Sequence, residues 1–584
     1  MSREARQLEH FDSLVSLFLT RAEEKGDAPF LWAKRDGAWQ SISWADAARQ
    51  VAALAASLLR IGLQPGDRVC LVSENRPEWL ISDLAIMAAG CVTVPTYTTN
   101  TPRDHAHILG NSGARAVIVS TAKLAKNLIP AVLTSSECHH VIGMESMRSG
   151  QTPDWVNCHS WGKLAGGEGD VAALRKQIAG IGRNDLACII YTSGTGGAPR
   201  GVQLHHGSLL HNIEGCTDII STDFGWDDEV FLSFLPASHA YEHTGGQMFP
   251  IALGAQIYFA ESLEKLAANI EEVQPTIMVV VPRLFEMLRT RIMKSIDSTG
   301  GLSKYLLKRA MKIGGDKAAG KFKPWDLPMD GVLSLTLRRK IRDKIGKRQK
   351  AWVSGGAPLN PEVGMFFESI GITFLQGYGQ TECGPVIACN RPSAGIRLDT
   401  VGPPVKNTEV RIADDGEIMV RGEHVMHGYW RNPEETARVL RDGWLATGDV
   451  GHFDAKGRIK ITDRKKDILV NDKGDNVSPQ RIEGMLTLQP EIAQAMVYGD
   501  RRPHLVALLV PDPEIAGAAG LHQKLQTAVD RVNADLSVIE KVRRFITADD
   551  AFTIENEQLT PSMKIRRHVI SKVYGERLAA LYGR

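Results

Sequence analysis

Short apolar runs alternate with amphipathic segments along most of the chain. Runs such as Arg68–Val72, Ala116–Val119 and Ile277–Val281 have the length and composition of buried strands, and stretches such as Glu78–Ala89 and Ser262–Val273 have helical spacing. Strands that alternate with helices build largely parallel sheets with helices on their faces. We therefore predict an α/β fold.

The length of the chain divides this fold into more than one domain. At 584 residues the chain exceeds the size at which a single hydrophobic core stops growing. The sequence GRIKITDRKKD, which ends at Asp467, predicts a short strand followed by a charged linker. We predict a large N-terminal domain of mixed sheets with flanking helices over residues 1–463, a hinge linker over 464–467, and a small mobile α+β domain over 468–584.

Composition and charge narrow the possible functions. The net charge of +2 gives no reason to expect nucleic acid as a partner. The eight cysteines show no metal-ligand spacing, and we expect reduced thiols. No run approaches the ~20 apolar residues of a membrane span, and the patch Leu14–Leu19 is too short for a signal segment. We expect a cytoplasmic protein that is soluble or at most rests on a membrane surface.

One region departs from this even charge distribution. Residues 304–350 contain 15 Lys and Arg residues against four Asp and Glu residues, a net charge of +11. Because Leu306, Trp325 and Leu335 are interleaved with these cations, the region would fit anionic lipid at the inner face of a membrane. A solvated helical insertion explains the same composition, and both interpretations stay open.

The segment Thr192–Gly201, TSGTGGAPRG, follows a predicted buried strand, Leu186–Tyr191. It contains three hydroxyl side chains, four glycines and one cation, Arg200. Glycines let the backbone approach a ligand closely, and N–H groups, hydroxyls and a cation suit phosphate oxygens. The Walker A pattern is absent, and a second short strand, Gly201–Leu204, is predicted to follow. A phosphate-binding loop and a glycine-rich hairpin turn are the two interpretations.

This loop resembles the signature of the adenylate-forming (AMP-binding) superfamily, in particular its long-chain fatty-acyl-CoA synthetases. The resemblance implies contacts with the phosphates of ATP for Thr192, Ser193, Gly194, Thr195 and Arg200. Two positions depart from the family pattern, since Gly196 replaces the usual threonine and Arg200 the usual lysine. Arginine keeps the charge but not the compact geometry of an ammonium group.

Four further segments resemble motifs of the same family, in the expected order. VSGGAPL at 353–359 is similar to the segment that closes over adenine, through Gly355, and GYGQTE at 377–382 is similar to the segment at adenine and the α-phosphate. WLATGD at 444–449 resembles the ribose clamp, and TPSMKIRRH at 560–568 resembles the segment with the catalytic lysine.

The resemblance assigns the nucleotide and metal contacts. They fall on Gly377 and Tyr378 beside adenine, Thr381 at the α-phosphate, Thr192 and Glu382 at Mg²⁺, Asp449 at the ribose, and Arg464 at ribose and phosphate. Carboxylate and hydroxyl oxygens beside phosphates suit a hard cation, and one carboxylate accepts two vicinal hydroxyls. For Arg464, a charge in a solvated linker is the alternative.

The catalytic set implied by the family is Lys564, with Glu382 and Thr192 at the metal. When a carboxylate attacks an α-phosphate, two anions meet, and a cation must neutralise the charge of the transition state. No base is needed, because the carboxylate is already ionised at pH 7. Transfer to a thiol then requires Lys564 to leave, and the family achieves this by a rotation about a residue that aligns with Lys466. Gly474 in the following loop would line the pantetheine path.

Two segments bear on the acid. LPASHAYE at 235–242 resembles the family's acyl-pocket mouth, where we place His239, with a structural histidine as the alternative. Gly245 and Gly246 would leave room for an acyl tunnel. QPTIMVVVPRLFE at 274–286 is similar to a stretch of long-chain members.

We therefore expect a ligase that uses ATP and Mg²⁺ to adenylate a long-chain fatty acid and transfers the acyl group to coenzyme A. Its partners would be the fatty acid, ATP and coenzyme A, and a homodimer is left open. One alternative keeps the adenylation but delivers a fatty-acyl or aryl group to the phosphopantetheine of a carrier protein, or acts on an aryl or medium-chain acid. Another is a non-catalytic nucleotide- or lipid-binding scaffold, which the changes at Gly196 and Arg200 would permit.

Overall fold

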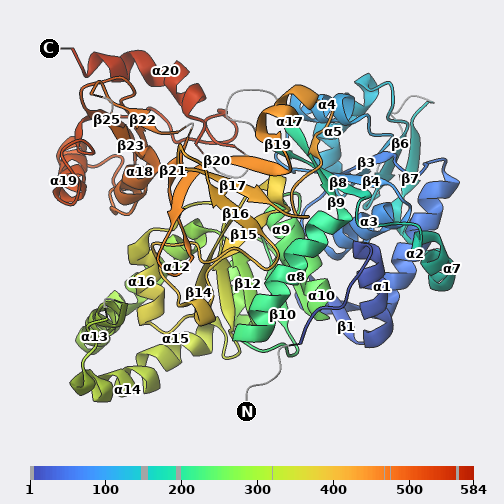
Figure 1. The fold of residues 1–584 in the computed structure, drawn as a ribbon, viewed down its shortest axis with the longest axis horizontal. Helices are drawn as coiled ribbons and strands as arrows, with labels where there is room; N and C mark the ends of the chain where they lie inside the picture. The colour runs from blue at the N-terminus through green and yellow to red at the C-terminus, as the bar shows by residue number, and fades with distance from the viewer. Residues whose placement is uncertain are drawn as a thin grey trace.

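The computed structural model describes residues 6–146, 155–192, 199–318, 320–465, 467–473, 475–560 and 565–583. Within these ranges two eight-stranded sheets form the body of the large N-terminal unit. A small C-terminal unit, drawn in orange-red to red, lies at one end of it (Figure 1). The predicted α/β body with a smaller second unit is confirmed.

The first sheet is parallel through its middle and antiparallel at both edges. In spatial order its strands are β15 (Val386–Cys389), β14 (Phe374–Gly379), β13 (Ala351–Ser354), β12 (Ile277–Val280), β10 (Val230–Ser233), β11 (Gln256–Phe259), β1 (Pro29–Arg35) and β2 (Ala38–Ser43). All four residues of β12 are buried. Their unbroken apolar sequence is what a parallel strand covered on both faces requires.

The second sheet carries the glycine-rich loop. In spatial order its strands are β18 (Gly428–Tyr429), β9 (Arg200–His205), β8 (Leu186–Thr192), β4 (Val92–Thr96), β3 (Arg68–Val72), β5 (Ala116–Val119), β6 (His140–Gly143) and β7 (Asn157–Ser160). β8 pairs parallel with β4 and antiparallel with β9. The chain therefore turns back after the loop as a strand, as predicted, and does not continue into a helix as a Walker A loop does.

One apolar core joins the two sheets. It contains residues of both sheets and of α1 (Leu14–Lys25), α2 (Trp44–Arg60), α3 (Pro77–Ala88), α8 (His206–Asp223) and α10 (Phe249–Leu253). Every residue of α3 is buried, and its sequence is apolar apart from Glu78, Ser82 and Asp83. The apolar patch Leu14–Leu19, too short for a signal segment, forms the first half of α1.

Further helices complete the N-terminal unit around this core. They are α4 (Pro102–Ser112), α5 (Ala122–Thr134), α6 (Trp161–Ala165), α7 (Val171–Ile178), α9 (Ala240–Glu242), the π-helix η1 (His243–Met248), α11 (Leu266–Val273), α16 (Pro361–Ser369), α17 (Pro433–Val439), and the 3₁₀ turns η3 (Thr381–Cys383) and η4 (Pro392–Ala394). An antiparallel sheet follows, with β16 (Glu409–Ile412), β17 (Glu417–Arg421), β20 (Trp444–Phe453), β19 (Leu440–Arg441) and, paired with β20, β21 (Ile459–Arg464).

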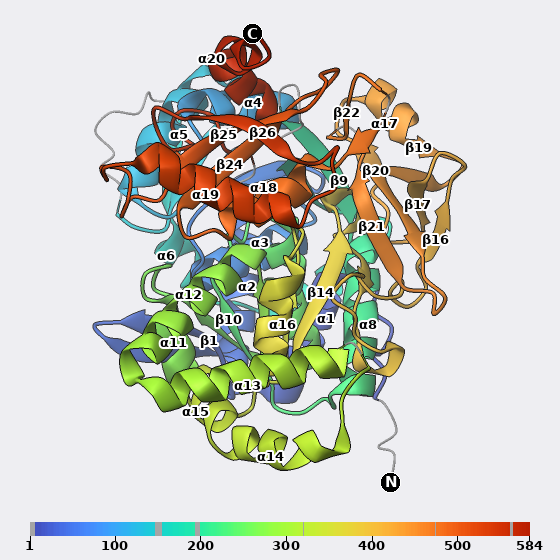
Figure 2. The same ribbon diagram turned by 90° about the vertical axis from the view of Figure 1, so that its left-hand side faces the viewer.

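The basic region forms a layer of helices at the edge of the molecule. It follows α12 (Pro282–Thr299) and comprises α13 (Gly301–Ala318), η2 (Pro324–Asp326), α14 (Leu327–Leu335) and α15 (Leu337–Ile345). In both views α14 lies at the end of the molecule opposite the C-terminal unit (Figures 1 and 2).

The C-terminal unit has its own core on both faces of a sheet. That sheet consists of β24 (Ile492–Tyr498), β25 (Leu505–Pro511) and β26 (Val542–Thr547). A separate two-stranded sheet pairs β22 (Leu469–Val470) with β23 (Asn476–Val477). Along β25 the buried side chains alternate, 505, 507 and 509 toward α18 (Pro479–Thr487) and α19 (Leu521–Ala534), and 506, 508 and 510 toward α20 (Arg567–Ala580). A strand covered on both faces is apolar at every position.

Candidate active site

The glycine-rich loop connects the two strands of a hairpin. Thr192 at the end of β8 pairs with Arg200 at the start of β9. Gly201 is required by packing, since a Cβ atom there would lie 2.7 Å from Cγ2 of Ile189. Ser193, Gly194 and Thr195 lie outside the described residues, so their contacts with phosphate stay a prediction.

The side chain of Arg200 joins this hairpin to the predicted metal ligand. Its guanidinium forms an ion pair with Glu435 of α17 and lies 4.6 Å from the centre of the Tyr429 ring. The Tyr429 hydroxyl in turn donates to Oε1 of Glu382 at 2.9 Å. A phosphate group that recruits Arg200 would therefore compete with Glu435 for the same cation.

The strand before the motif GYGQTE extends into the motif, which was predicted to begin after the strand. We predicted a strand at 372–375, whereas β14 extends to Gly379 and includes Gly377 and Tyr378. Thr381 and Glu382 follow in the 3₁₀ turn η3, and the Glu382 carbonyl accepts from the N–H of Met426 at 2.9 Å. The turn is thereby held against the segment that pairs with β9.

Asp449 brings three of the predicted nucleotide contacts together. Its Oδ2 accepts from the Tyr378 hydroxyl at 2.8 Å, and its Oδ1 accepts from Nε of Arg464 at 2.9 Å. The β20–β21 pairing places Asp449 opposite Arg464, so the second contact follows from the strand register. The Asp449 side chain is only 4% exposed, and that of Arg464 is 41% exposed. The site therefore offers an oriented carboxylate beside a solvent-accessible cation.

The electrostatics of this group fix its protonation. Burial raises the pKa of Tyr378 well above its ordinary value, so its hydroxyl stays a donor. For Arg464, burial opposes the charge, but the Asp449 carboxylate prevails and raises the pKa further. Such a group can accept the vicinal hydroxyls of a ribose on Asp449 while Arg464 meets an anion.

The adenine segment rests on a tyrosine that sequence reasoning did not single out. Gly355 follows β13, and a Cβ atom there would lie 2.8 Å from Cζ of Tyr241. The Tyr241 hydroxyl donates to the carbonyl of Val353 at 2.7 Å. Tyr241 lies within the acyl-mouth segment, so adenine and acyl segments share a wall. The neighbouring His239 caps α9 by accepting from the Tyr241 N–H at 3.2 Å.

The predicted room at two glycines is filled by neighbouring side chains. Gly245 and Gly246 lie in the π-helix η1, a distortion common at functional sites. A Cβ atom at Gly246 would lie 2.3 Å from Oε1 of Glu242, and one at Gly245 would lie 3.2 Å from Cγ2 of Val279. The space at Gly246 is thus taken by a buried carboxyl group, and the glycine is needed for that packing. A tunnel opening at this point would require Glu242 to move.

Glu242 is itself an unusual group. It is buried, and its Oε1 accepts from the Ser233 hydroxyl at 2.6 Å. Burial raises the pKa of the Glu242 carboxyl to about 8. The sequence gives no signal of this, because a glutamate in a helical segment is usually exposed.

The C-terminal residues of the predicted site lie outside the described residues. They are Lys466, Gly474 and Lys564. The flanks of the Lys564 segment are held in place, since Leu559 and Ile565 form an isolated bridge and Nη1 of Arg567 donates to Oε1 of buried Glu483 at 2.7 Å. Ahead of Lys466, the Lys465 ammonium donates to Asp415 at 2.6 Å and to Glu417 at 2.7 Å.

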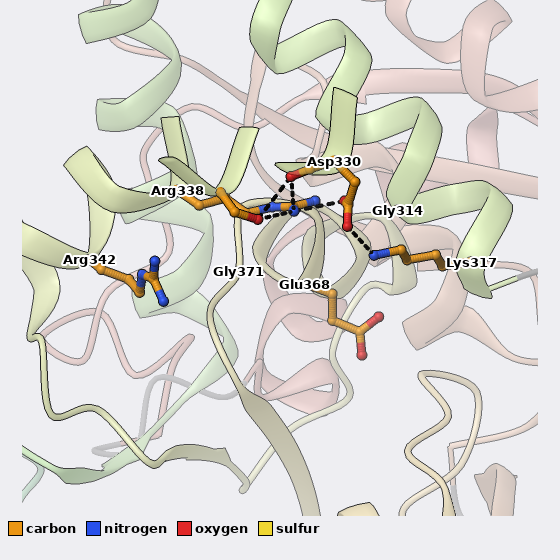
Figure 3. Close-up of a pocket in the computed structure, with 8 residues that line it drawn as sticks. Gly314, Lys317, Asp330, Arg338, Arg342, Glu368 and Gly371 are labelled. Carbon is orange, nitrogen blue, oxygen red and sulfur yellow. Dashed lines mark hydrogen bonds and ion pairs between the residues drawn. The ribbon is translucent and has the colours of Figure 1, made fainter. Parts of the chain in front are cut away.

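The residues present fit Mg²⁺ held largely by nucleotide phosphates. Glu382 offers a carboxylate and Thr192 a hydroxyl, the hard oxygen ligands that Mg²⁺ takes. In the part of the chain that the structure describes, no three His, Cys, Asp or Glu side chains form a ready-made metal site. A cavity of about 470 Å³ lies elsewhere, among α13 to α16, and is lined by residues such as Lys317, Asp330 and Arg338 (Figure 3).

The two-unit fold is that of an adenylate-forming enzyme, and the residues gathered at Asp449 come from motifs that resemble those of that family. The chain belongs to the AMP-binding enzyme family, because residues 18–430 match the family's model and residues 466–584 match that of its C-terminal domain. It is 32% identical to the long-chain-fatty-acid–CoA ligase FadD15 of Mycobacterium tuberculosis over 96% of each chain. It is 28% identical to a chloroplastic long-chain-fatty-acid–[acyl-carrier-protein] ligase of Arabidopsis thaliana, over 98% of this chain and 86% of that protein.

Solved structures agree on the fold. The adenylation domain of a carboxylate reductase from Mycobacterium chelonae superposes with a TM-score of 0.78 at 24% identity, covering 99% of this chain and 92% of that one. The anthranilate CoA ligase AuaEII with anthranoyl-AMP gives 0.76 at 19% identity, covering 99% and 100%.

Proposed function

We propose that the protein joins a long-chain fatty acid to coenzyme A at the expense of ATP. A carboxylate oxygen of the acid bonds to the α-phosphorus while the bond to pyrophosphate breaks, which gives an acyl-adenylate. The thiol of coenzyme A then attacks the acyl carbon and loses its proton, and AMP leaves. The observation that carries this proposal is the pair of hydrogen bonds that the Asp449 carboxylate accepts, one from Tyr378 of one motif and one from Arg464 of another.

Each residue has a task in the first step. Asp449 accepts the ribose hydroxyls, and Arg464 stands beside it as a cation at the junction of ribose and phosphate. Mg²⁺, when bound, neutralises the phosphate oxygens, with Glu382 and Thr192 as its ligands. Lys564 supplies the cation between the carboxylate and the α-phosphate.

The choice of acid and acceptor rests on the relatives. FadD15, 32% identical over nearly the whole chain, is a long-chain-fatty-acid–CoA ligase by name. The 274–286 segment, which resembles long-chain members, includes the buried strand β12 beside Gly245. ATP and coenzyme A as co-substrates agree with the cytoplasmic location predicted from the sequence.

Thioester formation from ATP, Mg²⁺, coenzyme A and fatty acids of increasing length tests the proposal. We expect turnover to peak at long chains, to be lost in Lys564→Ala, and to persist in Lys572→Ala, which removes an exposed lysine of α20. If neither acyl-adenylate nor thioester forms, the proposal fails and a non-catalytic nucleotide-binding scaffold takes its place.

A carrier protein is the second candidate acceptor, because one relative is named as an acyl-carrier-protein ligase. A panel with coenzyme A, free pantetheine and holo-acyl carrier protein separates the two. Acyl-adenylate that forms without thioester on coenzyme A, yet transfers to the carrier protein, would favour this second candidate.

A further inference from the structure

Helix α14 buries Leu333 on one side and exposes a second apolar side to solvent. Leu327 and Leu335 are 58% and 73% exposed, and Val332 is 46% exposed. Together with exposed Pro328 and Gly331, they cover one side of the helix, with no charged residue among them. We call these five residues, with Trp325 in the preceding turn, the α14 face. Trp325 is 72% exposed.

Ion pairs hold the helix in this orientation. Asp330, on the opposite side of α14, accepts from Nζ of Lys317 and from Nη1 of Arg338, both at 2.8 Å, as Figure 3 shows. Burial opposes the charge of Asp330, but Lys317 and Arg338 hold its pKa below the ordinary value. Because turning α14 to bury its leucines would break both pairs, the exposure of the α14 face is built into the packing.

Cations flank the α14 face along the chain. Lys321 and Lys323 precede it and Arg339 and Lys340 follow it, and all four are exposed. Nζ of Lys323 lies 5.2 Å from the centre of the Trp325 ring. An apolar surface with an indole and a rim of long basic side chains suits the boundary between acyl chains and anionic headgroups.

We propose that the α14 face docks onto a bilayer that contains anionic phospholipids. The net charge of +11 over 304–350 is complementary to such a bilayer, whereas a second copy of this chain would bring the same charge against itself. The position of the helix agrees, because α14 lies at the end of the molecule opposite the C-terminal unit (Figure 2). Within the ranges that the structure describes, no helix is long and apolar enough to cross a bilayer.

Co-sedimentation with vesicles tests the apolar part of the proposal. We expect the protein to bind vesicles of phosphatidylcholine that contain about one third phosphatidylglycerol, but not vesicles of pure phosphatidylcholine. Bound protein should dissociate as the salt concentration rises. Leu327→Ser with Leu335→Ser should weaken binding about tenfold or more. The matched control is the double variant Leu263→Ser with Val538→Ser. These two residues are 61% and 72% exposed elsewhere on the surface, and the control variant should bind vesicles as well as the unmodified protein.

The charged part needs variants that leave the packing intact. Arg338 is unsuitable, because Nε of its guanidinium also donates to the carbonyl of Ser369 at 2.9 Å. Arg339→Gln with Lys340→Gln should weaken binding to anionic vesicles several-fold, whereas Lys123→Gln with Lys126→Gln, exposed on α5, should not.

Three results would overturn the proposal. They are equal binding by the α14-face variant and its control, equal binding to neutral and anionic vesicles, and a dimer at micromolar concentration that the α14-face variant abolishes. The last result would make a second copy the occupant. Thioester formation without vesicles should be unchanged in every variant, so failure here is distinct from failure of the proposed reaction.

Discussion

At the scale of single residues, the proposed ribose site is tested at Asp449 and at one of its donors, Tyr378. Tyr378→Phe removes one neutral donor and keeps the ring, so we expect the KM for ATP to rise by no more than about fivefold. Asp449→Ala removes the proposed ribose acceptor and the partner of Arg464, and we expect kcat/KM for ATP to fall about 100-fold or more. Pyrophosphate release under steady-state conditions measures both.

The matched control for this comparison is Asp399→Ala. Asp399 is also paired with an arginine, Arg397 at 2.8 Å, but away from the motifs. Its loss should leave kcat/KM for ATP within about twofold, since surface ion pairs contribute little. A fall in Tyr378→Phe as large as in Asp449→Ala would mean that the pair acts as a unit and would contradict separate roles.

Glu242 gives a pH-dependent prediction. Its pKa is about 8 in the folded protein against an ordinary value of 4.5, so between these pH values the unfolded chain releases a proton that the folded one keeps. Stability should therefore fall as pH rises from about 4.5 to about 8, by at most about 5 kcal/mol. Glu242→Gln cannot ionise. The thermal unfolding midpoint of this variant, relative to that of the unmodified protein, should therefore rise from pH 5 to pH 8. A constant difference across this range would show that Glu242 is not the titrating group.

Which site residues the sequence predicts depends on how local their contacts are. Tyr378, Asp449 and Arg464 lie in motifs, and the antiparallel pairing of β20 with β21 brings the last two together over 15 residues of chain. The link from Arg200 to Glu435 spans 235 residues, and no local pattern predicts it. The carboxyl that fills the space at Gly246 escaped prediction because a glycine does not reveal what packs against it.

At the scale of elements, apolar runs predict buried strands well and their ends less well. β3 and β5 have the predicted bounds. β5 is buried throughout and β3 is buried after its first residue, and a polar turn ends each strand. α11 begins at Leu266 and not at the predicted Ser262. β14 continues through Gly377 to Gly379, where pairing with β15 overrides the low strand propensity of glycine.

The π-helix η1 makes a prediction at this scale. Gly246→Ala would place a methyl group 2.3 Å from Oε1 of Glu242, in a segment fixed between α9 and α10. We expect a loss of about 1–3 kcal/mol in the free energy of unfolding, measured by urea denaturation. Gly575→Ala is the matched control, because it lies within α20 and a Cβ atom there meets nothing within 4 Å. That variant should be neutral or gain up to about 1 kcal/mol. If both variants unfold alike, the close contact at Gly246 does not constrain η1.

At the scale of the whole molecule, the two units are joined at a point that is anchored on both sides. Lys465 is bound to Asp415 and Glu417 of the N-terminal unit, and Asp467 accepts from Nε2 of Gln480 in α18 at 2.9 Å. Across the units, Lys294 and Glu514 form an exposed ion pair at 3.2 Å, which contributes at most about 1 kcal/mol. Rotation between the units would therefore concentrate at residue 466.

Substitutions at Lys466 separate the two proposed half-reactions. Lys466→Pro fixes the backbone φ angle there, and we expect acyl-adenylate formation within about threefold of the unmodified protein but transfer to coenzyme A slowed at least about tenfold. Lys466→Ala removes the same charge and keeps the rotation, so it should transfer at close to the normal rate. Single-turnover assays of pyrophosphate and thioester release distinguish the steps. If Lys466→Pro slows both steps equally, the hinge lies elsewhere. If Lys466→Pro and Lys466→Ala slow the transfer step equally, the charge of Lys466 matters and not its backbone. If only the proline variant is slow, and only in transfer, the acyl-adenylate forms in one arrangement of the units and is consumed in another.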